Sequence, residues 1–205
     1  MATTKNTKAK KTAERKAAPK NTRRAKGASE TVSAIDLLED DHQEVQGYFD
    51  AYEELEDDDA KAALSAKICT ALKVHTQIEE ELFYPAARKA TKDDDLLDEA
   101  KVEHDGAKTL IEEIEAMEVG DDLYDAKVKV LGEQIKHHVK EEEEELFPEV
   151  KSAKMDVDGL GRKMAARKEE LMAERGESED DERVAIDRAA AGNKPGVSAK
   201  SREDC

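Results

Sequence analysis

The sequence contains few of the side chains that usually build a large core or a covalent framework. It has no tryptophan, and aromatic residues make up only 3% of its 205 residues. The two cysteines, Cys69 and Cys205, are too few for a disulfide framework. No apolar run approaches the roughly 20 residues of a membrane-spanning helix, and the first 30 residues lack the apolar stretch of a secretory signal. We therefore expect a cytoplasmic protein with a narrow core.

Charged residues, in contrast, make up 41% of the chain, and the two signs are unevenly distributed. Residues 1–29 contain ten Lys or Arg and one acid; since the whole chain carries −17, this segment is +9 and the rest is −26. Its other residues are mostly Ala and Thr, which cannot bury enough surface to fold. We predict that residues 1–32 form a basic disordered tail. Two roles are open for it: a polybasic arm that contacts nucleic acid or another anionic partner, or a solubilising tail that shields the acidic body.

Apolar residues recur at helical spacing from residue 33 onwards. The first helix begins at Ser33, with Asp36 as its capping-box partner, and three further helices follow the turns "EDDDA", "TKDDD" and the Gly120–Asp121 turn. Because the loops are short, residues 33–152 are expected to form an all-α, antiparallel up-down-up-down four-helix bundle. Within residues 153–205, the stretch "LGRKMAARKEELMAE" predicts an accessory fifth helix outside the bundle, followed by an acidic, flexible C-terminal tail.

One motif occurs twice in the chain. "HTQIEEELFYP" starts at His75 and "HVKEEEEELFP" starts at His138, and each places a glutamate four residues and a proline ten residues after the histidine. His42 precedes the first motif by 33 residues, and His104 precedes the second by 34. This spacing indicates that the two halves of the bundle are copies of one helix pair, related by pseudo-twofold symmetry.

Each predicted helix carries one histidine at a position where the helical pattern demands an apolar residue. A single inward histidine is usually a hydrogen-bonded core residue, but Glu79 and Glu142 lie one turn after two of them on the same face. Two buried carboxylates beside four imidazoles require either a compensating charge or a polar network. Lys108 is the nearest basic side chain that could supply the charge. A pair of divalent cations supplies that charge directly. The predicted metal ligands are His42, His75, Glu79, His104, His138 and Glu142.

Over about residues 33–150 the chain resembles the hemerythrin family, in its HHE cation-binding branch. The resemblance lies in "DDHQEV" around His42, "EHDGAKTLIEEI" around His104, and the two repeated motifs. It implies a non-haem centre of two Fe ions, with binding or sensing of O2, NO or iron itself. His42 and His75 would bind one iron, His104 and His138 the other, and Glu79 and Glu142 would bridge them.

The chain departs from this family at one position. Oxygen-carrying hemerythrins have a second histidine one turn after the first on the third helix, where this sequence has Lys108. The departure implies a more symmetric and more open centre, less suited to stable oxygen carriage. The family also places a carboxylate five residues after its histidine, as Glu142 follows His137; the offset of the first repeat favours His138 instead.

Three functions remain open from the sequence: a di-iron binding or sensing protein, a di-iron oxidase or peroxidase that acts on O2 or peroxide, and a nucleic-acid-associated sensor that uses the basic tail. Mn or Zn suit the same ligands as Fe. The acids that flank the ligands are read as a solvated face, some of them orienting the histidines; these are Glu80, Glu81, Glu141, Glu143, Glu144 and Glu145. Leu82, Phe83 and Phe147 are expected to wall the site, and Pro85 and Pro148 to break or kink the helices that carry them.

Overall fold

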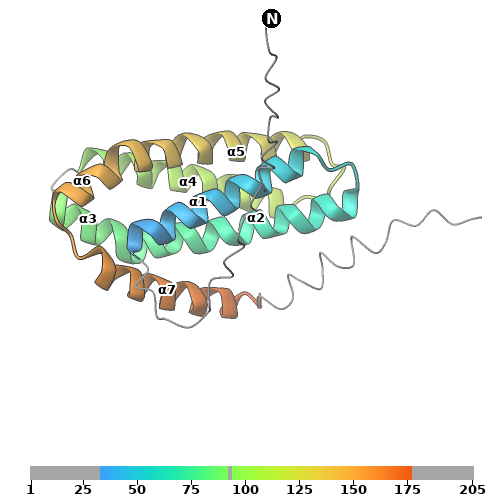
Figure 1. The fold of residues 1–205 in the computed structure, drawn as a ribbon. Coiled ribbons are helices and arrows are strands. Elements are labelled where there is room, and N and C mark those ends of the chain that lie inside the picture. Colours follow the sequence, from blue (N-terminus) through green and yellow to red (C-terminus); the bar gives the residue numbers. More distant parts are fainter. Residues whose placement is uncertain (1–32, 92–93, 177–205) are drawn as a thin grey trace, which may run out of the picture. The chain divides into compact units, whose positions relative to one another are not determined.

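The computed structural model describes residues 33–91 and 94–176, and within them it contains helices and no strands (Figure 1). The predicted all-α bundle is thereby confirmed, whereas the predicted tails at residues 1–32 and 177–205 lie outside the described residues. The helices that form the bundle are α1 (Ala34–Glu53), α2 (Asp58–Ile78), α3 (Tyr84–Thr91), α4 (Asp95–Glu115), α5 (Tyr124–Glu141) and α6 (Phe147–Ser152).

The bundle consists of four rods: α1, α2–η1–α3, α4 and α5–η2–α6. The second and fourth rods each contain a π-helical segment at the same point of the repeat. η1 (Glu79–Phe83) joins α2 to α3 without a gap, and η2 (Glu142–Leu146) joins α5 to α6 in the same way. π-segments inside α-helices are rare and occur mostly at functional sites. Since α3 and α6 continue through Pro85 and Pro148, these prolines do not break the helices.

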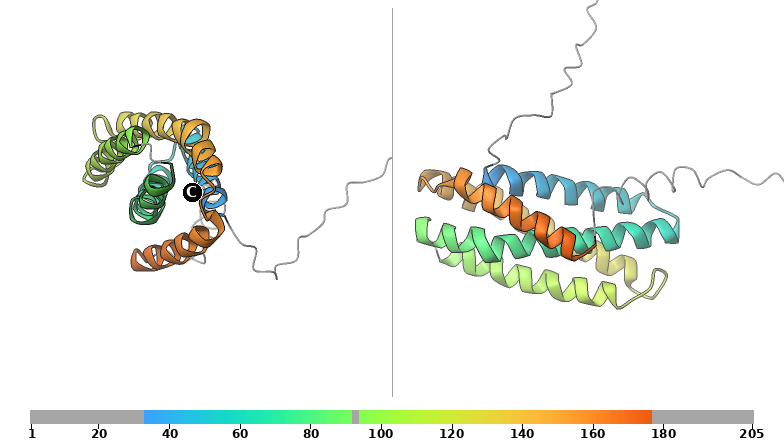
Figure 2. Two further views of the ribbon diagram at one scale, coloured as in Figure 1. Left: turned by 90° about the vertical axis from the view of Figure 1, so that its left-hand side faces the viewer. Right: turned by 90° about the horizontal axis from the view of Figure 1, so that it is seen from below.

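The four rods form a closed antiparallel bundle, seen end-on in Figure 2. α1 packs against α2 and α5, and α4 packs against the same two helices. The first helix begins as predicted, because the Ser33 side chain accepts a hydrogen bond from the Ile35 N–H at 3.2 Å. Gly132 on α5 permits the close approach of α1, since a Cβ at this position would stand 3.0 Å from the Phe49 ring.

Two apolar layers lie on either side of the buried histidines along the rods. One layer contains Leu38, Ile78 and Phe147, and the other contains Phe49, Leu72, Ile111 and Leu131. On α1, on α4 and on the rod that contains α5, the histidine lies between the residues of one layer and those of the other, and on α2 His75 lies between Leu72 of one layer and Ile78 of the other. The polar side chains therefore occupy a shielded level in the middle of the bundle.

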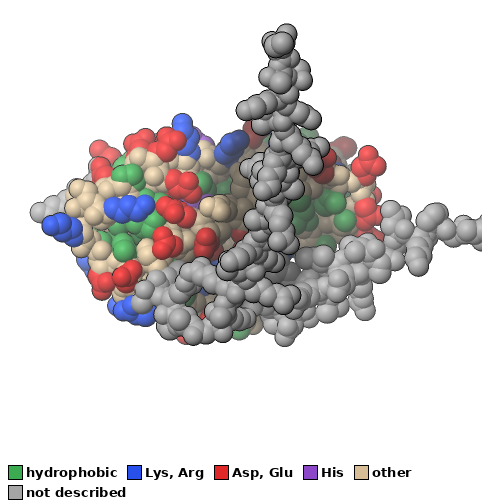
Figure 3. Space-filling model, viewed as in Figure 1, with side chains coloured by type: hydrophobic (Ala, Val, Ile, Leu, Met, Phe, Trp, Pro, Cys, Tyr) green, Lys and Arg blue, Asp and Glu red, His purple; other side chains and the backbone are tan. Residues whose placement is uncertain are grey.

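A fifth helix, α7 (Val157–Glu174), packs outside the bundle along α1, α2 and η1, as predicted (Figure 1, orange). Its buried Met164 and Leu171 belong to the same apolar layer as Val74 and Ile78 of α2. Acidic side chains are scattered over the face shown in Figure 3, among hydrophobic and basic ones. None of the helices described here is long and apolar enough to cross a membrane.

Candidate metal centre

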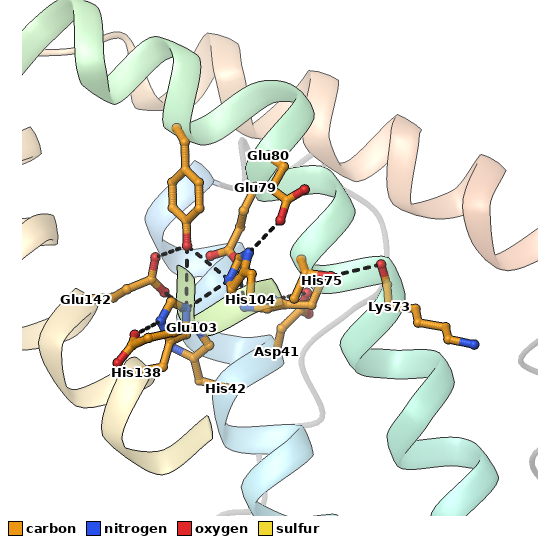
Figure 4. Close-up of polar contacts among 12 residues, drawn as sticks. Asp41, His42, Lys73, His75, Glu79, Glu80, Glu103, His104, His138 and Glu142 are labelled. Atoms are coloured by element: carbon orange, nitrogen blue, oxygen red, sulfur yellow. Dashed lines mark hydrogen bonds and ion pairs between the residues drawn. The ribbon is translucent and has the colours of Figure 1, made fainter. Parts of the chain in front are cut away.

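The six side chains predicted as metal ligands meet at one level of the bundle (Figure 4). Four rods contribute one histidine each, and the first residues of η1 and η2 contribute the two glutamates. Their exposed fractions do not exceed 6%, and Glu79 is fully buried. The six residues are His42, His75, Glu79, His104, His138 and Glu142.

Glu79 lies between the two halves of the repeat. Its Oε2 atom is 3.2 Å from Nε2 of His75, one turn earlier on the same rod, and 3.3 Å from Nε2 of His104 on α4. The π-helical start at Glu79 is therefore the point at which the first motif reaches the second half of the bundle.

Glu142 has the equivalent position in the second motif and reaches back to the first half of the bundle. Its Oε2 atom is 3.3 Å from Nε2 of His42 and 3.7 Å from Nε2 of His138. Donor atoms within 4.8 Å of one another form two groups, one of His42, His75, Glu79 and Glu142, the other of Glu79, His104 and His138. The pairing of histidines is the one that the sequence resemblance implied.

Several of these buried atoms lack a hydrogen-bond partner within the described part of the chain. They are Nε2 of His42 and His75, both carboxylate oxygens of Glu79, and Oε2 of Glu142. A buried polar atom without a partner costs about 1–3 kcal/mol, and more if it is charged. The Nε2 atoms of the four histidines lie 3.2–3.7 Å from Oε2 of Glu79 or Glu142, a spacing that suits ligand atoms around a shared ion. The donor set therefore fits bound cations.

A carboxylate faces the Nδ1 atom of every one of the four histidines. Glu143 is 2.9 Å from His42, Asp41 is 3.5 Å from His75, Glu80 is 3.1 Å from His104, and Glu103 is 2.7 Å from His138. We call these four residues the outer acids. Such carboxylates fix the ring orientation of a ligand histidine and turn its Nε2 atom toward the metal.

The outer acids follow the repeat. Asp41 and Glu103 each precede the first histidine of a half and contact the second histidine of that half. Glu80 and Glu143 each follow the buried glutamate of one half and contact the first histidine of the other half. Glu80 and Glu143 are among the flanking acids noted from the sequence, whereas Asp41 and Glu103 were not predicted at the site, although both stand directly before one of the four histidines.

Two lysines neutralise two of the outer acids. Lys168 of α7 forms an ion pair with Oδ1 of Asp41, and Lys108 of α4 forms one with Glu80. Lys108 was considered from the sequence as the charge that compensates the core glutamates. In the structure its ammonium lies instead on an outer acid.

Tyr84 was not predicted at the site, yet its hydroxyl lies inside it. The hydroxyl donates a hydrogen bond to Oε1 of Glu142 at 2.9 Å and lies 3.2 Å from Nε2 of His104 and 3.5 Å from Nε2 of His138. The second motif has Phe147 at the matching position, where the ring stacks on His42 with its centroid 6.0 Å away. This difference between the two motifs was visible in the sequence and makes the halves chemically unequal.

The ionisable groups show where positive charge is needed. Burial lowers the pKa of His42, but the Glu142 carboxylate, 3.3 Å from its Nε2 atom, outweighs this effect and raises the pKa to about 9. Burial and the nearby charge of Glu142 raise the pKa of Glu79 well above its usual value. Burial lowers the pKa of His75 to about 4. Without bound cations, both raised pKa values favour the protonated forms of His42 and Glu79.

His137, the alternative to His138, is directed away from the buried centre. Its side chain is 62% exposed, whereas the side chain of His138 is 5% exposed. The structure thus brings His138, and not His137, together with the other three histidines.

A small cavity adjoins the four histidines on the side of the apolar layer that contains Phe49 and Leu72. Its volume is about 10 Å³, roughly the space that one water-sized sphere requires. Besides the histidines and Asp41, its lining residues are Val45, Leu72, Thr76, Ile135 and Val139. Only a very small molecule fits beside the centre without a rearrangement of the bundle.

Comparisons with known proteins agree with this geometry. The family model described as the hemerythrin HHE cation-binding domain matches residues 33–150. A crystal structure of a hemerythrin HHE cation-binding domain-containing protein from Mycobacterium kansasii is 26% identical, with a TM-score of 0.61. The similarity covers 70% of this chain and 89% of that one. No curated protein matches the chain significantly.

Proposed function

The chain belongs to the hemerythrin HHE cation-binding family, and from this premise we propose that its buried centre holds two iron ions and binds or senses a small diatomic molecule such as O2 or NO. The observation that carries the proposal is the convergence of buried nitrogen and oxygen donors from four rods, several of which have no hydrogen-bond partner within the described residues. In a shielded interior these atoms are stable only around positive charge.

The ligands would divide between the two ions along the halves of the repeat. His42 and His75 would hold one iron, and His104 and His138 the other. Glu79 and Glu142 reach both groups and would bridge them, as their contacts with one histidine of each half allow.

Tyr84 adds a phenol oxygen beside the second of these ions. Its distances of 3.2 and 3.5 Å to the imidazole nitrogens are ligand-to-ligand spacings. We infer that the His104 and His138 position has an oxygen donor that the His42 and His75 position lacks.

Charge balance supports two divalent ions. Glu79, Glu142 and the four outer acids carry six negative charges when ionised, and Lys108 and Lys168 neutralise two of them. The remaining four negative charges equal the charge of two divalent cations. Iron bound at such a mixed imidazole and carboxylate site supplies a change of oxidation state and an open coordination position.

The surroundings restrict what reaches the centre. Phe83 and Phe147 are fully buried beside it, and the adjacent cavity is apolar apart from the histidines, Asp41 and Thr76. A cavity this small favours a diatomic ligand over an organic substrate, and its apolar wall favours exclusion of water.

Metal analysis and spectroscopy test this proposal. Full-length protein reconstituted with Fe²⁺ without oxygen is expected to hold two irons per chain, and its absorption spectrum should change when NO or O2 is added. Retention of less than one iron per chain, or a spectrum that neither gas alters, would contradict it. Parallel loading with Mn²⁺ and Zn²⁺ identifies the preferred ion.

The substitution His75→Ala tests the ligand assignment itself. It removes one of the two imidazoles of the first ion, so bound iron should fall by half or more. Val74→Ala is the matched control, because it removes buried volume from the neighbouring residue on the same helix and should leave the iron content unchanged. Full iron content in His75→Ala protein would refute the assignment.

An oxidase or peroxidase activity is a second candidate function, and one contact favours it. The Tyr84 hydroxyl, hydrogen-bonded to Glu142, places a proton donor inside the centre, which reduction of O2 or peroxide requires. Sustained turnover of peroxide by iron-loaded protein, lost in Tyr84→Phe, would favour the enzyme over the binding protein.

A further inference from the structure

A second group of metal-ligating side chains lies at the surface beside the buried centre. Glu103 of α4 and His137 and Glu141 of α5, here called the outer trio, offer donor atoms within 4.8 Å of one another. Nε2 of His137 is 3.6 Å from Oε1 of Glu103 and 3.3 Å from Oε1 of Glu141. Ligands at about 2.1 Å from one tetrahedral ion stand about 3.4 Å apart, so these spacings fit a shared cation.

The pseudo-twofold repeat identifies this place as a position for positive charge. Glu103 corresponds to Asp41, since each precedes the first histidine of its half and contacts the second. One oxygen of Asp41 faces His75, and the other binds the ammonium of Lys168. One oxygen of Glu103 binds His138, and the other faces His137. The outer trio thus surrounds the point that corresponds to the Lys168 ammonium.

The helix faces beside Asp41 and beside Glu103 also differ, because the first is buried and the second is partly exposed to solvent. In the first half, Val74 and Ile78 of α2 are buried under α7. The matching residues of α5 are His137 and Glu141, one turn apart, with side chains 62% and 28% exposed. Within the described residues, α7 packs along α1, α2 and η1. Where the first half has a covering helix and a lysine, the second half therefore has exposed ligand-type side chains.

We propose that the outer trio binds a third divalent cation and passes such ions to the buried centre. Two carboxylates and one imidazole suit Fe²⁺, Mn²⁺ or Zn²⁺, and three protein ligands leave positions for water, so that the ion exchanges readily. Binding at the outer trio stands on its own geometry. Its role in metal acquisition rests on the function proposed above for the buried centre.

Glu103 is the residue through which the two sites communicate. The ligands of the buried centre are at most 6% exposed, so an ion reaches them only through a transient opening of the bundle. Glu103 is 22% exposed and hydrogen-bonds to His138 at 2.7 Å (Figure 4). An ion held by the outer trio is therefore already next to a ligand of the buried centre, and its local concentration there is high.

Manganese binding tests the outer site. Full-length protein with its buried centre filled with iron is titrated with Mn²⁺, and the electron paramagnetic resonance signal of free Mn²⁺ reports binding. Wild-type protein is expected to bind one Mn²⁺ per chain, and His137→Ala or Glu141→Gln at least about tenfold more weakly. Glu112→Gln, which removes an exposed acid elsewhere on α4, should bind as wild type. Absence of saturable binding, or equal binding by His137→Ala, overturns the proposal.

The rate of iron loading tests the acquisition role. Metal-free protein is mixed with limiting Fe²⁺ without oxygen, and filling of the buried centre is followed by resistance to a chelator. His137→Ala should fill about tenfold more slowly than wild type but reach the same iron content; equal rates overturn the acquisition role. If neither wild type nor variant fills, the proposed function fails, whereas Mn²⁺ binding by the metal-free protein that depends on His137 still supports the outer site.

Discussion

Tyr84 and Phe147 occupy the same position in the two motifs, yet only Tyr84 offers an oxygen to the centre. Its hydroxyl contacts Glu142 and lies within 3.5 Å of two histidine nitrogens. Phe147 instead places a ring face beside His42. A single change of residue type between the repeats therefore makes a nearly symmetric ligand set unequal in donor chemistry.

The Tyr84→Phe substitution tests this inequality. It removes the oxygen and keeps the ring, so the affinity for the ion at the His104 and His138 position should fall by about tenfold, as on loss of a residue that supports a metal ligand. Chelator competition, which separates the two ions by their affinities, measures this effect. Tyr124→Phe is the control, because the Tyr124 hydroxyl bonds Ser65 away from the centre. Equal effects of the two substitutions would show that Tyr84 only packs.

At the scale of the elements, the two π-segments position the buried glutamates. Each begins at the glutamate of its motif, and each rod continues in a new α-helical register afterwards. The motif spacing predicted which residues share a face, but it did not predict the change of register, since an α-helical pattern and a short π-segment differ by one residue. For the same reason Tyr84 was not among the residues predicted at the site.

The fifth helix contributes to the site through one side chain. Lys168 of α7 binds Asp41, which faces His75. Burial raises the pKa of Asp41, but the hydrogen bonds and charges of His75 and Lys168 outweigh it and lower this pKa below its usual value. Through this contact α7 supports a carboxylate that faces His75.

Substitution of Lys168 by Met should weaken binding of the ion at the His42 and His75 position by about tenfold, because Asp41 loses its cation and the His75 ring its fixed orientation. Lys168→Arg should preserve affinity, and Lys163→Met, which removes an exposed lysine from the same helix, should be neutral. Chelator competition gives the affinity, and a melting curve is recorded separately. A lower melting temperature with unchanged affinity would assign Lys168 a purely structural role.

At the scale of the whole molecule, the centre links stability to pH. The folded-state pKa of His42, about 9, is above the usual 6.5, so its stabilisation is complete below pH 6.5 and is lost as the pH rises to 9. The folded-state pKa of His75, about 4, is below 6.5, so stability falls as the pH drops from 6.5 to 4. Since the raised pKa of Glu79 acts in the same direction as that of His42, the metal-free protein should lose stability as the pH rises above 6.5.

Metal loading should change this profile. Bound cations replace the proton on His42, so the decline between pH 6.5 and 9 should disappear and the melting temperature should rise at every pH in that range. Calorimetry of metal-free and iron-loaded protein from pH 4 to 9 measures both effects. If the two forms melt at the same temperature throughout, the buried side chains form a polar network rather than a metal centre.

The sequence by itself determined the bundle, its repeat and the six inward side chains. Helical periodicity and the spacing of repeated motifs are local properties that can be read along the chain. The acidic body and the basic residues 1–29 were also evident, and the role of that segment stays a prediction. Only the tertiary structure brought Asp41, Tyr84, Glu103 and Lys168 to the centre. Their contacts join different helices, and which side chains meet across a bundle depends on the rotation and register of each helix, which local spacing does not encode.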